Sequence, residues 1–159
     1  HREVFYLGPS GRDARTEGFA RAFRDRKLRP PEAWAPGNYR FSTADGRRAA
    51  RDLLARRPGA TAAFACSDRF AYGVLAELAA RGVDVPGKIS VIGFDDRSPS
   101  QFVSPPLSTV AHPHEEVGKL AAEVLLGKIG GTVKPGEGSR TAVPRFVERE
   151  STRALAGSE

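Results

Sequence analysis

The sequence predicts an α/β protein with a Rossmann-like parallel sheet that carries helices on both faces. Over residues 1–94, short apolar segments typical of strands alternate with segments whose apolar residues recur at helical spacing. Strands that alternate with helices form parallel sheets joined by right-handed crossovers. The chain has 159 residues and 40% apolar content, which is enough for one domain with a core but not for two ordinary domains.

The first strand and helix are predicted near the start of the chain. The apolar and aromatic run Val4–Leu7 predicts a strand, which the Gly8-Pro9 pair ends. Residues 13–26 then show a helical pattern whose apolar stripe is Phe19, Ala22 and Phe23. After two prolines, a weaker segment covers residues 33–39.

Two further helices and two strands follow. Ser42 stands three residues before Asp45 in a variant of the capping box, so a helix begins there, and Pro58-Gly59 ends it. One face of that helix is Gly46, Ala49, Ala50, Leu53 and Leu54. Residues 61–66 predict an apolar strand, and residues 89–94 predict one buried on both faces. The helix between them ends at Gly82, and its apolar stripe is Ala71, Val74, Leu75, Leu78 and Ala79.

The pattern changes beyond residue 94. Residues 95–110 are rich in Pro and Ser and predict irregular structure. A helix then begins at Pro113, with two glutamates in its first turn. Its apolar face is Val117, Leu120, Ala121, Val124 and Leu125. Residues 127–138 predict a glycine-rich loop, and residues 141–148 predict a final strand broken at Pro144.

Composition narrows the class of protein. No stretch approaches the roughly 20 apolar residues that cross a bilayer, and the first residues carry no secretion-signal pattern, so no membrane partner is predicted. The single cysteine, Cys66, cannot form an internal disulfide, which favours the cytoplasm. Basic residues exceed acidic ones by six, 25 against 19. The excess is Arg interleaved with Asp, Glu and Ala, which indicates solvated helix faces rather than a nucleic-acid groove.

Polar and aromatic side chains gather where the predicted strands end. In open parallel sheets, ligands bind outside the carboxyl ends of the strands. The residues at those positions are Arg12, Asp13, Arg15, Phe41, Ser67, Asp68, Asp95 and Asp96. Carboxylates, a guanidinium and an aromatic face suit a hydroxylated or polar ligand, held by bidentate hydrogen bonds and ring stacking.

Each of these residues also has a purely structural interpretation. Ser67 and Asp68 can cap the helix that follows them. The aspartate pair at 95–96 can belong to a turn, and Phe41 can be a packing residue. The sequence by itself leaves both interpretations open.

Reactive and metal-binding chemistry is weakly indicated. Cys66 lies at a strand end without an identifiable basic partner, so we interpret it as a small buried hydrophobic residue. His112 and His114 flank a proline and have no clustered Cys or His nearby in the sequence. We therefore predict neither a metal nor a cofactor.

Five segments that together cover nearly the whole chain carry a resemblance to a known family. In order, they are HREVFYLGP, DARTEGFARAF, ATAAFACSDRFAYGVLAELAARGVDVPGKISVIGFDD, SPPLSTVAHPHEEVGKLAAEVLLGKI and FVEREST. Together they resemble the LacI/GalR family of bacterial transcription regulators. The resemblance implies the second lobe of a type I periplasmic-binding-protein-like fold. It also implies that Arg15 binds the effector, that Asp95 accepts hydrogen bonds from sugar hydroxyls, and that Phe41 stacks on the ligand.

Three further residues complete the predicted effector site. Ser67 stands where the family commonly has asparagine, so an amide is replaced by a shorter hydroxyl. Asp68 follows it, and His112 stands where glutamine is frequent. These departures concern the identity of the effector rather than the location of the site.

The resemblance also implies a domain division. Residues 1–110 correspond to the second lobe, residues 111–144 to a hinge crossing and elements of the first lobe, and residues 145–159 to a return strand and tail. The first lobe and an N-terminal helix-turn-helix, through which operator DNA is bound, are expected outside this chain.

The implied function is a non-catalytic sensor of a small effector, a carbohydrate or related metabolite, that controls DNA binding. A solute-binding protein of a sugar transporter shares the fold and is the main alternative. An enzyme or phosphoacceptor that uses Asp95 and Asp96 as an acidic site is a third hypothesis, which ranks last because the sequence offers no partner lysine or metal triad.

Family members dimerise partly through this lobe, so the resemblance implies a homodimer. The predicted interface uses Tyr72, Val74 and Leu75 on the helix after the Ser-Asp pair, and Phe102 in the irregular tract. The apolar helix that begins at Pro113 offers a second surface, with exchange of that helix between chains as an alternative.

Overall fold

A computed structural model describes residues 1, 3–8, 14–28, 30, 40–134 and 136–154. Its five-stranded sheet has the order β1-β2-β3-β4-β5, in which the first four strands are parallel and β5 is antiparallel to β4. The strands are β1 (Val4–Leu7), β2 (Ala62–Ala65), β3 (Ser90–Asp95), β4 (Ser108–Ala111) and β5 (Arg145–Val147). The helices are α1 (Ala14–Asp25), α2 (Thr43–Arg56), α3 (Asp68–Ala80), the short 3₁₀ helix η1 (Ser98–Gln101) and α4 (His114–Ile129).

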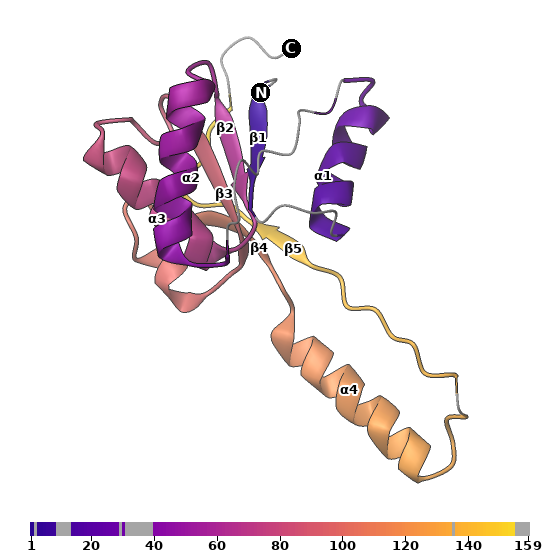
Figure 1. Ribbon diagram of the computed structural model, residues 1–159. Coiled ribbons are helices and arrows are strands. Elements are labelled where there is room, and N and C mark those ends of the chain that lie inside the picture. The colour runs from indigo at the N-terminus through magenta and orange to yellow at the C-terminus, as the bar shows by residue number, and fades with distance from the viewer. Residues whose placement is uncertain (2, 9–13, 29, 31–39, 135, 155–159) are drawn as a thin grey trace.

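Helices lie on both faces of the sheet, as the sequence predicts. Figure 1 shows α2 and α3 together on one side and α1 on the other. On the α1 side, Phe19 lies with its ring centroid 6.0 Å from that of Tyr6 and 6.1 Å from that of Phe64. Ala22 is exposed, so the predicted α1 stripe consists of Phe19 and Phe23 without it.

The predicted boundaries agree with the observed elements over most of the chain. Ser42 is the N-cap of α2, and its side chain accepts a hydrogen bond from the Asp45 amide. Four of the five residues predicted for the apolar face of that helix are buried, and Leu54 is half-buried. β5 begins directly after Pro144. The segment at 33–39 lies outside the described residues.

Strand β4 is the main element that the sequence analysis did not predict. It lies within the stretch assigned to irregular structure and a hinge crossing, and it pairs with β3 in register Gly93↔Thr109. Its first two residues, Ser108 and Thr109, are buried although they are polar, because hydrogen bonds satisfy their hydroxyl groups. An apolar pattern is therefore absent from this strand.

Helix α4 projects away from the sheet (Figure 1). It contains no buried residue, and Val117, Leu125, Leu126 and Ile129 are exposed. The helix continues to Ile129, three residues into the predicted glycine-rich loop.

Two glycines bring α2 and α3 into close contact. A Cβ atom on Gly46 would overlap the carbonyl oxygen of Phe70, and a Cβ atom on Gly73 would overlap that of Thr43. Glu77 on α3 adds ion pairs to α2, since its carboxylate lies 3.1 Å from Arg47 Nε. The two helices thus form one tightly packed layer.

The predicted dimer residues Val74 and Leu75 require a correction. Both are buried in the core of the single chain, where they belong to the same apolar stripe as Leu78. Side chains with so little exposed surface offer almost no area to a second molecule. Tyr72 is half-buried and Phe102 is exposed, so these two aromatic residues remain available at the surface.

The glycine contact predicts opposite effects for the same substitution at three helical positions. Gly46→Ala and Gly73→Ala should lower the free energy of unfolding by about 1–3 kcal/mol, because each methyl group overlaps backbone of the facing helix. Gly18→Ala on α1 is the matched control, since its Cβ would meet nothing within 4 Å. It should raise stability by about 0.5–1 kcal/mol through helix propensity. Urea unfolding measures all three, and equal effects at the three sites would contradict this packing.

Candidate functional site

The carboxyl ends of the parallel strands bring the predicted ligand-binding residues to one edge of the sheet. Arg15 lies in the first turn of α1, just beyond β1. Ser67 and Asp68 follow β2, and Asp95 is the last residue of β3. Arg12 and Asp13 lie outside the described residues.

The guanidinium group of Arg15 is held in a defined position. One of its nitrogens, Nη1, donates a 2.7 Å hydrogen bond to the carbonyl oxygen of Cys66 at the end of β2. Its Cζ lies 5.4 Å from the ring centroid of Phe41 and 5.6 Å from that of Phe94, both within the range of cation–π attraction. Phe41 is 45% exposed, so its ring remains accessible to a ligand.

Phe94 is a residue of this site that the sequence analysis treated only as the end of a strand. Its ring centroid lies 5.6 Å from Arg15 Cζ, and it directly precedes Asp95 in the sequence. An aromatic residue next to a carboxylate at a carboxyl strand end is the signal that could have identified it.

Asp95 lies in a partly buried and strained position. Its side chain is 25% exposed, and its carboxylate lies 3.7 Å from Arg97 Nε. Asp95 and Asp96 both have positive φ, 116° and 54°, a region that non-glycine residues rarely occupy. Burial raises the pKa of Asp95, and the negative charge of Asp68 raises that pKa further, while Arg97, Arg15 and His114 oppose the rise.

Ser67 and Asp68 occupy structural positions. Ser67 is the N-cap of α3, and its hydroxyl oxygen accepts a hydrogen bond from the Phe70 amide at 3.3 Å. Asp68 is fully buried, and both of its carboxylate oxygens accept hydrogen bonds from the protein. The structure therefore does not expose the Asp68 side chain at the edge where Arg15 and Asp95 lie.

The remaining predicted residues lie around the start of α4. Arg149 Nη2 donates a 2.7 Å hydrogen bond to Asp96, so the two adjacent aspartates have different partners. The rings of His112 and His114 lie 4.8 Å apart, and His112 is exposed.

A cavity of about 570 Å³ opens beside Asp95, and its lining residues are Arg69, Tyr72, Asp95, Asp96, Arg97, Ser98, Pro99 and His114.

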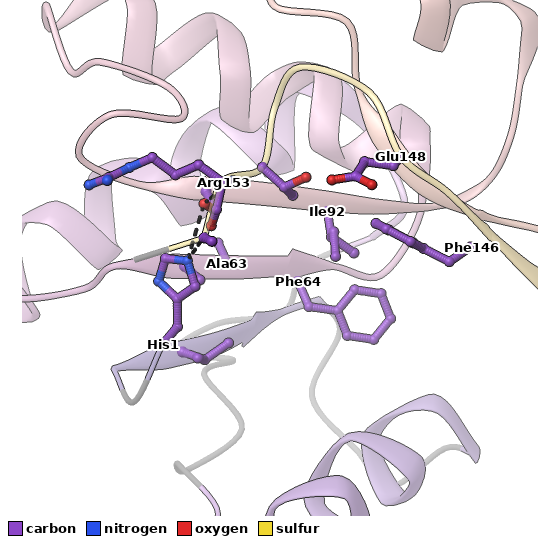
Figure 2. A pocket seen from close by; sticks show the side chains of 12 residues that line it. His1, Ala63, Phe64, Ile92, Phe146, Glu148 and Arg153 are labelled. Atoms are coloured by element: carbon purple, nitrogen blue, oxygen red, sulfur yellow. Dashed lines mark hydrogen bonds between the residues drawn. The ribbon is translucent and has the colours of Figure 1, made fainter. Parts of the chain in front are cut away.

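Two other concave surfaces are lined mainly by apolar residues. One, of about 390 Å³, lies over the α1 side of the sheet toward the amino ends of the strands, and its lining includes Phe64, Ile92 and Phe146 (Figure 2). Figure 2 also shows the His1 ring, whose Nε2 atom lies 3.0 Å from the Arg153 carbonyl oxygen. The other, of about 430 Å³, lies against the apolar face of α4. Neither surface contains Arg15 or Asp95.

The described part of the chain contains neither a metal-binding cluster nor a membrane-spanning helix. Its residues include no group of three or more His, Cys, Asp or Glu side chains placed to bind a metal. None of its helices combines the length and the apolar character required to cross a bilayer.

Known proteins resemble this chain over most of its length. Residues 1–152 match the family of periplasmic binding protein-like domains. The chain is 35% identical to the ribose operon repressor of Haemophilus influenzae over 143 residues, which are 89% of this chain and 42% of that protein. It is 37% identical to the transcriptional repressor CytR of Escherichia coli over 142 residues, 89% of this chain and 41% of that protein. The chain thus spans about two fifths of the length of these relatives.

Solved structures agree with these sequence matches. A LacI family transcriptional regulator from an Arthrobacter species, in complex with lactose, superimposes with a TM-score of 0.83 at 31% identity, over 96% of this chain and 58% of that one. A LacI family regulator from Enterococcus faecium with bound ribose gives a TM-score of 0.76 at 26% identity, over 98% and 58%. The chain therefore belongs to the LacI/GalR family of transcription regulators and forms part of their periplasmic-binding-protein-like domain.

Proposed function

We propose that this chain is the effector-binding part of a non-catalytic regulator that senses a small hydroxylated ligand, a sugar or a related metabolite. The observation that carries the proposal is the Arg15 guanidinium, which lies close to two aromatic rings and is hydrogen-bonded to the end of β2. Asp95 stands at the same edge with a partly exposed carboxylate. A positioned donor and an acceptor at one edge are what recognition of neighbouring hydroxyl groups requires.

The chemistry of the three side chains fits a sugar. The Asp95 carboxylate accepts hydrogen bonds from hydroxyl groups, and the Arg15 guanidinium donates them. Phe41 presents an exposed ring against which the apolar face of a sugar can pack. Lactose and ribose are bound by two related regulators of similar fold, which supports this ligand class for the present chain.

The relatives favour a regulator over a transport protein, because the similar curated proteins are repressors of transcription. In this proposal the protein works in the cytoplasm, and operator DNA is bound by a helix-turn-helix in the complete protein. The paired-aspartate hypothesis gains no support, since Asp96 is engaged by Arg149 at 2.7 Å and the two carboxylates do not share a partner.

We further propose the division into lobes. Residues 1–110 form one lobe, residues 111–144 cross into the other lobe, and residues 145–159 return. The projection of α4, which contains no buried residue, supports this division, because an exposed apolar helix face implies a further surface against it. In this arrangement, His112 lies at the crossing, where the two lobes enclose the ligand.

Removal of either polar group should weaken ligand binding in the protein from the complete gene. A calorimetric comparison of ribose, lactose and other sugars first identifies a ligand. Arg15→Ala and Asp95→Ala should then each reduce the binding free energy by about 1.5–3 kcal/mol, the scale of a hydrogen bond to a charged group. Asp25→Ala, at an exposed α1 residue, is the control and should bind like the wild type. Unchanged affinity in both site variants would exclude this site.

The raised pKa of Asp95 predicts a pH dependence. Sugar affinity should fall as the pH is lowered through that raised pKa, because protonation removes an acceptor, and the fall should begin at higher pH than for an ordinary aspartate. The same shift makes the stability of the fold depend on pH. The raised pKa stabilises the folded state at pH values below the ordinary pKa of aspartate, and this stabilisation is lost as the pH rises through the raised pKa of Asp95. Asp95→Asn should therefore be more stable than the wild type at neutral pH, while its weaker sugar binding should no longer follow this titration. Denaturation and calorimetry over a pH series measure both effects.

We also propose that the protein forms a homodimer through the tract around η1. Phe102 is 80% exposed directly after η1, and the Tyr72 hydroxyl lies 2.9 Å from Ser100 Oγ in the same tract. Exposed aromatic residues are enriched at the centres of protein interfaces.

A charged residue at this position should therefore oppose association. Phe102→Glu should raise the dimer dissociation constant by at least tenfold in sedimentation or light scattering, since hot-spot aromatic residues contribute about 2 kcal/mol or more. Val117→Glu tests the apolar face of α4 in parallel. Dissociation by Val117→Glu alone would assign the association to α4 instead.

A further inference from the structure

The buried carboxylate of Asp68 connects α3 to three other parts of the chain. One oxygen, Oδ1, accepts a 2.6 Å hydrogen bond from the Thr109 hydroxyl on β4. The other oxygen accepts a 2.6 Å bond from the Ser100 hydroxyl on η1 and a 2.8 Å bond from the Arg97 amide. Asp68 itself is the first residue of α3, so one side chain joins α3, η1, β4 and the turn after β3.

The three hydrogen-bond donors to this carboxylate are two hydroxyls and an amide, all uncharged. A buried carboxylate is costly unless its oxygens are fully hydrogen-bonded. The N-terminus of α3 also favours a negative charge at this position. The side chain therefore requires each of these donors to stay in place.

The neighbouring strand is shaped around this group. A Cβ atom on Gly93 of β3 would overlap Oδ1 of Asp68 and approach Leu107 at 2.9 Å. Gly93 pairs with Thr109 across the sheet, so glycine at this position gives the carboxylate access to β4.

The bond to Arg97 fixes the turn that carries the ligand-binding aspartate. Asp95 and Asp96 have φ values of 116° and 54°, and Arg97 is the next residue. Strained backbone of this kind persists only where surrounding interactions determine it. The Asp68–Arg97 bond restrains the turn at its far end, immediately after the two strained residues.

We propose that Asp68 is a positioning residue for ligand binding: its carboxylate holds the 95–97 turn in its strained conformation and so sets the direction of the Asp95 side chain. This inference rests on the proposed function, in which Asp95 contacts the ligand. Through Thr109 the same carboxylate fixes β4, from which the chain continues into α4. Asp68 therefore acts through Asp95 and does not contact the ligand itself.

The first test needs no ligand and uses the protein from the complete gene. Asp68→Ala should increase hydrogen–deuterium exchange at least tenfold in the peptide spanning residues 95–101. Val74→Ala, a cavity-forming change on the same helix, is the control for lost stability, and it should leave this peptide protected. Asp68→Asn should restore most of the protection, since its amide can accept from Arg97 and Ser100 while donating to the Thr109 hydroxyl.

A crystal structure of Asp68→Ala provides the second measurement. The positive φ values at Asp95 and Asp96 should relax when the restraint is removed. An unchanged turn together with unchanged exchange would overturn the proposal. If Asp68→Ala does not fold, Ser100→Ala and Thr109→Val each remove one bond and should cause smaller increases in exchange.

Titration with ribose separates this proposal from the proposed function. If ribose binds the wild type, Asp68→Ala should weaken it at least tenfold, Asp68→Asn should recover most of the affinity, and Val74→Ala should bind normally. Equal losses in Asp68→Ala and Val74→Ala would assign Asp68 a merely structural role. A wild type that binds no sugar would count against the proposed function, while the exchange measurement would still decide whether Asp68 holds the turn.

Discussion

The second half of the sheet depends on the hydrogen bonds that the fully buried carboxylate of Asp68 accepts. The carboxylate lies where α3, β3 and β4 meet, and its hydrogen bonds replace the apolar contacts that usually hold a strand in a core. Hydrogen bonds require particular distances and angles, so the two hydroxyl donors and the amide donor must keep defined positions around the carboxylate. The turn at 95–97 and the path of β4 are therefore determined together.

A second set of buried hydroxyl groups continues this arrangement toward the end of the chain. The Ser151 hydroxyl donates a 2.6 Å bond to the Val91 carbonyl oxygen and accepts a 2.8 Å bond from the Ser108 amide. The Ser108 hydroxyl in turn lies 2.9 Å from that of Thr152. Residues from the far end of the sequence thus lie along β3 and β4, and serine and threonine hydroxyls join them to the sheet.

This polar packing explains what the sequence could and could not predict. The strands β1, β2 and β3 are apolar and were predicted, since burial by the hydrophobic effect leaves a readable pattern. Ser108 and Thr109 begin β4, and hydrogen bonds to distant residues satisfy their buried hydroxyl groups, so no local apolar pattern identifies that strand. The apolar stripe of α3 was predicted, but Val74 and Leu75 were also assigned to an interface, and their burial in the core leaves almost no surface for a partner.

The residues of the candidate site were likewise predictable only in part. The rule that ligands bind at carboxyl strand ends selected Arg15, Asp95 and Phe41 as candidates, because it depends only on the order of strands and helices. It could not distinguish the fully buried carboxylate of Asp68 from the partly exposed carboxylate of Asp95. β4, held by Asp68, continues into α4, a helix of 16 residues without a buried side chain. Most of the stability of a helix in a protein comes from the packing of its apolar face, so α4 should be more stable when another surface covers it. The proposed ligand-binding edge and this exposed helix are consequently joined through one strand, β4, to which Asp68 is hydrogen-bonded inside the core.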